Sequence, residues 1–138
     1  MKKDCIGNDI RILSHQIHRW IENSPNKKKI DSVTGANAWI IGYISDKTKN
    51  NEDVFQKDLE KNFEITRSTA SKVVNLMVEK GMVERQSVPW DARLKKLILT
   101  DKGREINELM LEDFSVVEET LSKGFSEQEL EQFFDYIH

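Results

Sequence analysis

Residues 66–99, TRSTASKVVNLMVEKGMVERQSVPWDARLKKLIL, decide the fold, because they contain a helix start, an apolar helical stripe, a helix stop and a charged hairpin. Thr66 suits the N-cap of a helix over 67–80, and Gly81 suits its end. The residues expected on its apolar side recur at helical spacing: Ala70, Val73, Leu76 and Met77. The opposite side carries small or basic residues: Arg67, Ser68, Thr69, Ser71, Lys72 and Asn75. Such a face can approach a DNA duplex closely.

The residues after Gly81 change to an alternating pattern. One run covers 82–88 and another covers 94–99, with a loop at 89–93 between them, so the pattern predicts a β-hairpin. Arg93 would lie at its tip. A helix followed by a hairpin with a basic tip is the layout of a winged helix-turn-helix, in which the helix enters a major groove of DNA and the wing reaches an adjacent minor groove.

Helical periodicity extends on both sides of this stretch. On the N-terminal side it predicts helices over 7–23 and 53–62, and a second helix that begins at Ser32 or Thr34, with the basic run 27–29 in a loop. On the C-terminal side we expect a long helix capped by Thr100 and a last helix opened by a capping box at Ser126. The predicted fold class is therefore mainly α with a small β-hairpin wing.

The composition bounds what the chain can be. Its 138 residues suit one domain, and no apolar run approaches the roughly 18 residues of a membrane helix, so we expect a cytoplasmic protein without a membrane partner. One cysteine excludes an intramolecular disulfide and any all-cysteine zinc site. The chain has three histidines, no G-x-S-x-G motif and no phosphate-binding glycine loop, so an enzyme is not expected.

The net charge of −3 is unevenly distributed. Residues 1–46 carry +2 and residues 47–104 carry +4, whereas residues 105–138 carry −9. The positive charge therefore coincides with the predicted helix and wing, and the overall acidity does not argue against a nucleic-acid partner. A winged protein-interaction module or antirepressor that does not bind DNA remains the alternative, and a DNA shift assay would separate the two.

Five ordered motifs make the chain resemble the MarR family of transcriptional regulators. They are QKDL at 56–59, ITRSTASK at 65–72, EKGMVER at 79–85, DAR at 91–93 and LTDKG at 99–103. The resemblance covers nearly all of the chain. It implies a single domain over 1–138, with a winged helix-turn-helix at 32–100 and dimerisation helices at 6–23 and 101–138. The chain departs from the family at Glu64, where the family favours glycine.

The resemblance also implies roles for individual residues. Ser71 and Lys72 fall where the family makes base-edge or phosphate contacts, and Arg93 would enter the narrow minor groove. Asp91 would hold the wing, with Arg85 as its partner. Lys95 and Lys96 would flank Arg93 as phosphate contacts. Trp90, beside the tip, is expected to pack the wing onto the body of the domain, and a contact with the sugar backbone of DNA is the alternative.

The expected function is a homodimeric repressor that a small-molecule effector releases from a palindromic operator. The family binds such effectors in a cleft between the dimer helices and the winged part. The candidate lining residues are His15, Trp39, Tyr43, Met110 and Phe114. A repressor that senses oxidants through Cys5 is a further alternative. We expect no cofactor and no metal site, since the zinc-responsive relatives use histidines on the long helix, which has none here.

Overall fold

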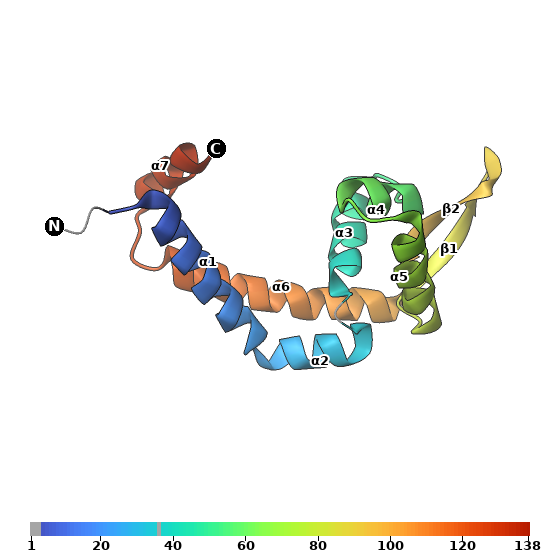
Figure 1. The fold of residues 1–138 in the computed structure, drawn as a ribbon, viewed down its shortest axis with the longest axis horizontal. Helices are drawn as coiled ribbons and strands as arrows, with labels where there is room; N and C mark the ends of the chain where they lie inside the picture. The colour runs from blue at the N-terminus through green and yellow to red at the C-terminus, as the bar shows by residue number, and fades with distance from the viewer. Residues whose placement is uncertain (1–3, 36) are drawn as a thin grey trace. The chain divides into compact units, whose positions relative to one another are not determined.

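The computed structural model describes residues 4–35 and 37–138 (Figure 1). This part of the chain is mainly helical with one antiparallel hairpin, as the sequence predicts. It forms two compact units, residues 25–110 and the two segments that end at Ser24 and begin at Leu111. The elements in chain order are α1 (Ile6–Glu22), α2 (Pro25–Thr34), α3 (Ala38–Lys49), α4 (Gln56–Asn62), α5 (Arg67–Glu79), β1 (Val83–Val88), β2 (Asp91–Leu99), α6 (Asp101–Ser122) and α7 (Glu127–Ile137).

The unit 25–110 has one hydrophobic core. The helix α3 contributes Ile40, Ile41 and Ile44 to this core, and all three are fully buried. The other buried apolar residues of this core come from every neighbouring element: Ile30, Val54, Leu59, Val74, Met77, Met82, Val83, Leu97, Leu99 and Ile106. Burial of this apolar surface is the main force that holds α4, α5 and the hairpin in fixed positions.

The helix α2 is the main departure from the predicted elements. The helix α1 ends at Glu22, and Pro25 begins α2, because a proline at the first helical position loses no hydrogen bond and has the right φ. The basic run 27–29 therefore lies in a helix and not in a loop. The next helix begins after Asn37, so neither Ser32 nor Thr34 starts it.

The turn from α4 to α5 brings the two helices against each other. At the start of α4 the Asp58 carboxylate accepts a hydrogen bond of 2.8 Å from the backbone N–H of Phe55. Glu64, in the turn itself, has a φ of 51°, in the left-handed region that favours glycine. The family's preference for glycine here thus has a conformational reason, and this chain makes the same turn with a glutamate.

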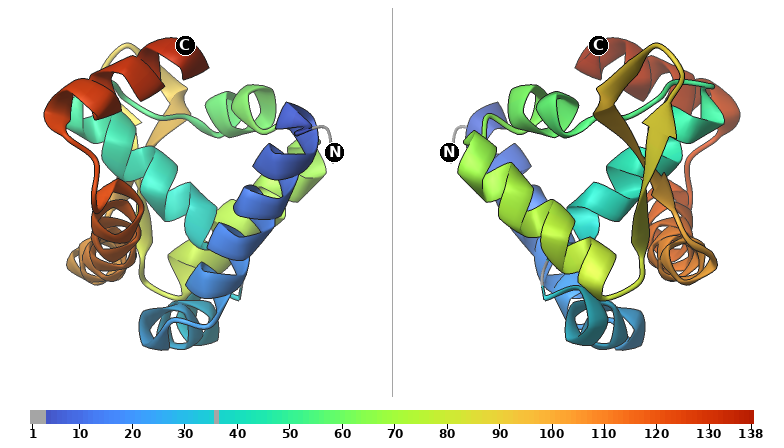
Figure 2. Two further views of the ribbon diagram at one scale, coloured as in Figure 1. Left: turned by 90° about the vertical axis from the view of Figure 1, so that its left-hand side faces the viewer. Right: turned by 90° about the vertical axis from the view of Figure 1, so that its right-hand side faces the viewer.

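The hairpin leaves the end of α5 and returns to the start of α6 (Figure 2). Its strands pair from Val83 with Leu99 to Ser87 with Lys95 in regular register. The backbone N–H of Leu97 also donates to the carbonyl of Val54, at 2.7 Å. The base of the hairpin is therefore tied to the chain before α4 as well as to its own partner strand.

Both ends of the hairpin are fixed at one point, which we call the hairpin junction (residues 80–82 and 100–103). The Thr100 hydroxyl donates to the carbonyl of Gly81 at 2.6 Å and accepts from the Gly103 N–H at 3.1 Å, so it is the N-cap of α6 as predicted. The Thr100 N–H donates to the carbonyl of Met82 at 3.1 Å. The junction joins the end of α5 to the start of α6.

The other unit contains α1, α7 and the second part of α6, and it has little core of its own. Neither α1 nor α7 has a buried residue. The large apolar side chains that are exposed here are Ile6, Ile10, Ile12, Leu13, Trp20, Leu111, Phe114, Val116, Leu121, Phe125, Phe133, Phe134, Tyr136 and Ile137. The Ser24 hydroxyl donates to the Asp113 carboxylate at 2.7 Å and joins the end of α1 to α6.

Over the residues that the structure describes, none of the helices has the length and apolar character that crossing a membrane requires.

Candidate nucleic-acid interface

The helix α5 presents one polar face and one buried face. Its N-cap is Thr66, whose hydroxyl accepts from the Thr69 N–H at 3.1 Å, as the sequence predicts. Ala70, Val74 and Met77 are fully buried, whereas Val73 and Leu76 of the predicted stripe are half-buried and pack against the core. The predicted contact residues are exposed, apart from the half-buried Ser71: Arg67, Ser68, Thr69, Lys72 and Asn75.

The most exposed line along α5 follows from helical geometry. Ser68, Lys72, Asn75 and Glu79 are separated by four, three and four residues, so their side chains lie in one row. This row combines a hydroxyl, an ammonium group and an amide, which are the groups that form hydrogen bonds with base edges in a major groove. Glu79 ends the row with a negative charge, so the chemistry suited to DNA lies in the N-terminal half of the helix.

A hydrogen bond joins the wing to this row. The guanidinium of Arg85, on β1, donates to the side-chain oxygen of Asn75. Arg85 therefore contacts α5 and not Asp91, the partner that the resemblance implies. Because a guanidinium can only donate, the amide oxygen of Asn75 must face Arg85, and its NH₂ group remains available.

The tip of the wing is tighter than the sequence predicts. The connection has only two residues, Pro89 and Trp90, because Val88 already pairs with Asp91. The register then shifts, so Arg93 lies on a bulge of β2 instead of in a loop, and its side chain is 93% exposed. The Asp91 carboxylate accepts from the Arg93 N–H at 2.9 Å and lies 3.7 Å from its Nε, so Asp91 fixes the bulge.

The two lysines after the bulge point to opposite faces of β2, as strand alternation requires. Lys95 donates to the Ser87 hydroxyl at 2.7 Å and is exposed. Lys96 lies 3.5 Å from the Asp53 carboxylate and is largely covered. The structure thus keeps Lys95 on the same surface as Arg93 and turns Lys96 away from it.

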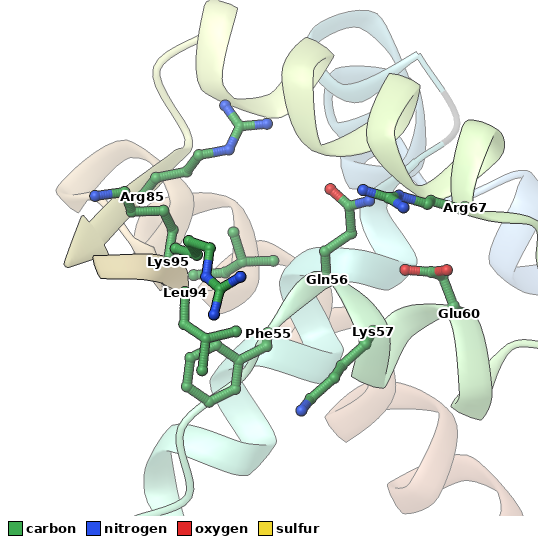
Figure 3. A pocket seen from close by; sticks show the side chains of 10 residues that line it. Phe55, Gln56, Lys57, Glu60, Arg67, Arg85, Leu94 and Lys95 are labelled. Carbon is green, nitrogen blue, oxygen red and sulfur yellow. The ribbon is translucent and has the colours of Figure 1, made fainter. Parts of the chain in front are cut away.

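An open cleft of about 450 Å³, which we call the basic cleft, lies between α4, the start of α5 and the wing (Figure 3). Its lining residues are Phe55, Gln56, Lys57, Glu60, Arg67, Arg85, Arg93, Leu94, Lys95 and Leu97. Five of these are cations and one is a carboxylate, so the cleft suits an anion. In Figure 3 the side chains of Gln56 and Arg67 point toward one another across it.

Sequence reasoning missed the contribution of α4 to this cleft. Gln56, Lys57 and Glu60 occur in a predicted helix of mixed charge, and charged residues there are usually only solvated. The available signal was their place directly before the α4–α5 turn, which brings the start of α4 beside the start of α5. Trp90 was also judged incorrectly: it does not pack onto the body but is 66% exposed.

The residues suggested for an effector site belong to different units. Trp39 and Tyr43 pack on Phe63, with ring centroids 4.4 and 5.3 Å apart, and Met110 packs against the same core. His15 and Phe114 lie in the other unit, where both are exposed. None of the five lines the basic cleft.

Cys5 precedes α1 and is an exposed free thiol. His15 is also exposed, and no group of three or more metal-ligating side chains occurs among residues 4–35 and 37–138.

Comparisons with known proteins agree with this geometry. A family model described as "MarR family" matches residues 32–94. The transcription regulator MarR from Oenococcus oeni PSU-1 is 30% identical, with 96% of this chain and 95% of that chain covered and a TM-score of 0.63. A point mutant of MepR from S. aureus is 23% identical, covers 97% and 94%, and has a TM-score of 0.76.

A third solved structure contains DNA. It is a putative MarR-family transcriptional regulator from Listeria monocytogenes complexed with 26mer DNA, 20% identical, with 98% of this chain and 85% of that chain covered and a TM-score of 0.68. The likeness to these structures confirms the winged-helix fold. The matched family model and the relative from Oenococcus oeni together identify the chain as a member of the MarR family of DNA-binding transcriptional regulators.

Proposed function

We propose that this protein is a homodimeric repressor that binds a palindromic operator in duplex DNA and releases it when a small-molecule effector binds. The observation that carries the proposal is the basic surface formed by α5, the start of α4 and the wing, on a chain whose net charge is negative. Since a polyanion is attracted to local cations, this surface can bind DNA despite the acidic remainder.

The row on α5 enters the major groove in this proposal. Lys72 donates to guanine O6 and N7 or to a phosphate, and Ser68 and Asn75 reach the neighbouring base edges. Their short or unbranched side chains let the helix backbone come close to the duplex. Ser71, half-buried beside this row, and Thr69 are placed to contact the sugar–phosphate wall of the groove.

The basic cleft holds the phosphate backbone between the two grooves. Three of its exposed cations, Lys57, Arg67 and Lys95, come from three different elements, and each can reach a phosphate oxygen without reading sequence. Arg93, which lines the cleft from the bulge of β2, enters the adjacent minor groove, where the negative potential is concentrated. The resemblance to the MarR family implies the same roles for Lys95 and Arg93.

The exposed apolar side chains of α1, α6 and α7 support dimerisation. A surface patch of this extent is uncommon on a monomer, and a two-fold partner would cover it with the same patch. A dimer would place two α5 helices on successive half-sites about one helical turn apart, which makes the operator palindromic. A change in the spacing of the two α5 helices in the dimer can then change the affinity for the operator.

Release needs an effector that prefers the conformation with low DNA affinity. The proposed effector residues remain His15, Trp39, Tyr43, Met110 and Phe114. One solved structure similar in fold is the heme sensor protein PefR from Streptococcus agalactiae in complex with heme, which supports control by a small molecule as a class of mechanism. Oxidation of the exposed Cys5 is the second route to release.

Selection of bound sequences from a random duplex pool tests the proposal, followed by affinity measurements at several salt concentrations. We expect the selected sequence to be palindromic. The affinity of the protein for it should fall about 10³-fold or more between low and moderate salt if six to ten phosphates are contacted. Arg93→Ala and Lys72→Ala should each cost about 1–3 kcal/mol per site. Lys123→Ala, an exposed lysine of the other unit, is the matched control and should change little.

Two results would contradict the proposed function or a part of it. If no sequence is enriched, the winged fold serves a protein partner and the proposal is wrong. If the winner binds equally with and without Arg93, the wing has another role. Repeating the measurement under oxidant and reductant decides whether Cys5 takes part in release.

A further inference from the structure

Trp90 is distinguished from every other apolar side chain around it. Over the described residues of 25–110, it is the only large apolar side chain that is exposed; all the others with this property lie in the second unit. It occupies the two-residue connection at the end of the hairpin, on the part of the wing that extends beyond α4 and α5 (Figure 1). The indole ring of Trp90 is therefore exposed to water at the tip of the hairpin.

The tip holds Trp90 in a defined place. Pro89, the residue before it, has a fixed φ, and Val88 is 5% exposed and so anchors the end of β1. On the other side, Asp91 pairs with Val88 and its carboxylate binds Arg93. The connection between two anchored residues is short, so the backbone here loses little conformational entropy when the indole binds a partner.

The charge around Trp90 indicates what that partner is. Arg93, with a 93% exposed side chain, and Lys95 follow within five residues, while the nearest carboxylate, Asp91, is already bound to Arg93. A basic tip with an aromatic ring matches a surface that is anionic and also offers apolar faces. The walls of a DNA minor groove have this character, because phosphates alternate there with deoxyribose rings.

We propose that Trp90 packs against the deoxyribose rings that line the minor groove beside Arg93, and thereby supplies the part of wing affinity that does not depend on salt. This inference rests on the proposed function and names a contact that the proposed function does not contain. An indole against a sugar releases no counterions, whereas each cation that neutralises phosphate does. The two tip residues therefore act on different parts of the binding free energy.

The experiment compares full-length Trp90→Ala, Trp90→Phe and Arg93→Ala with the wild type on the selected operator. Trp90→Ala should lower affinity about tenfold at every salt concentration and leave the salt slope unchanged. Arg93→Ala should lower both the affinity and the slope. Trp90→Phe keeps an aromatic ring and should retain most of the affinity.

Fluorescence gives an independent reading. The chain has three tryptophans, and Trp20 and Trp39 lie on α1 and α3 and not on the hairpin. The change in tryptophan emission on adding operator DNA should therefore appear in the wild type and disappear in Trp90→Phe, which still binds. Unchanged affinity in Trp90→Ala, or an emission change that persists in Trp90→Phe, would overturn the inference.

Two further outcomes are separable. If Trp90→Ala changes the oligomeric mass and not the operator affinity, the tip contacts a second copy of the chain and the DNA contact is wrong. If the wild type enriches no DNA sequence, the proposed function fails and this inference with it. If the wild type binds its operator and Trp90→Ala binds it with the same affinity, this inference is wrong but the proposed function is not affected.

Discussion

At the scale of single residues, the hydrogen bond between Arg85 and Asn75 orients the side-chain amide of Asn75 on the exposed face of α5. The bond uses the amide oxygen of Asn75 and leaves its NH₂ group outward. A group that donates selects acceptors, which in the major groove are N7 and O6 of guanine, N7 of adenine and O4 of thymine. In the proposed complex with DNA, Arg85 would thus be a positioning residue: it lies on the wing and would act through Asn75.

Replacing Arg85 by methionine should free the amide to rotate and so weaken sequence discrimination. We expect Asn75→Ala to remove the penalty, about 1–3 kcal/mol, for changing the base pair that faces it, and Arg85→Met to remove a large part of the same penalty. The measurement is a set of affinities for operators with single base-pair changes.

The double variant decides between a shared and a separate role. Arg85→Met combined with Asn75→Ala should discriminate no worse than Asn75→Ala alone, because both substitutions remove one interaction. Additive losses would instead mean that Arg85 contacts DNA on its own account from within the basic cleft.

At the scale of elements, the hairpin junction requires a glycine at the start of α6. A Cβ built at Gly103 would lie 2.3 Å from the carbonyl oxygen of Met82, the same oxygen that accepts from the Thr100 N–H. No side chain fits at that distance, so the end of the wing and the start of α6 would have to separate. This contact gives the LTDKG motif at 99–103 a steric reason.

Gly103→Ala should therefore lower the free energy of unfolding by about 1–3 kcal/mol, measured by urea denaturation. Gly7→Ala is the matched control, since Gly7 also lies in the first turn of a helix but has open space around its Cα. It should be neutral or slightly stabilising, because alanine favours a helix. Equal stability of the Gly103 and Gly7 variants would show that the junction adapts.

The elements themselves could largely be predicted from the sequence, because their signals are local. The cap at Thr66, the stop at Gly81 and the cap at Thr100 each need only a few neighbouring residues. The register of the wing could not, since the bulge that carries Arg93 depends on how two strands pair. The basic cleft was missed for a similar reason, as its cations come from α4, α5 and both strands.

One local signal was ambiguous and misled the prediction. Pro25 both ends a helix and favours the first position of the next, and only the burial of Ile30 and Thr34 distinguishes α2 from a basic loop. Exposure at a hairpin tip is likewise not encoded in the sequence, so Trp90 was expected to pack as tryptophans usually do.

At the scale of the whole molecule, the unit of α1, α7 and the second part of α6 exposes apolar side chains that the proposed dimer would bury. Ile10→Glu or Phe134→Glu would place a charge in the proposed dimer interface, at sites that are 62% and 49% exposed in the single chain. Each should give a monomer in analytical ultracentrifugation. Operator affinity should fall about 10²-fold or more, since two linked heads bind far more tightly than one.

Gln16→Glu is the control for the added charge, because Gln16 is an exposed polar residue on the same helix as Ile10. It should remain dimeric with full operator affinity. A Phe134→Glu protein that stays dimeric and binds DNA normally would place the interface elsewhere.

The hairpin junction has a consequence for how such a protein can diverge or be engineered. Both ends of the wing are fixed at the junction, and β2 is held a second time where Leu97 bonds Val54. Strand residues beyond those ties, toward the tip, can therefore be lengthened, shortened or exchanged without moving α5. The tip of the wing can therefore be exchanged as a separate part. Grafting a different tip between positions 87 and 95 should change which flanking bases the protein prefers in an operator, while the preferred central half-site sequence stays the same.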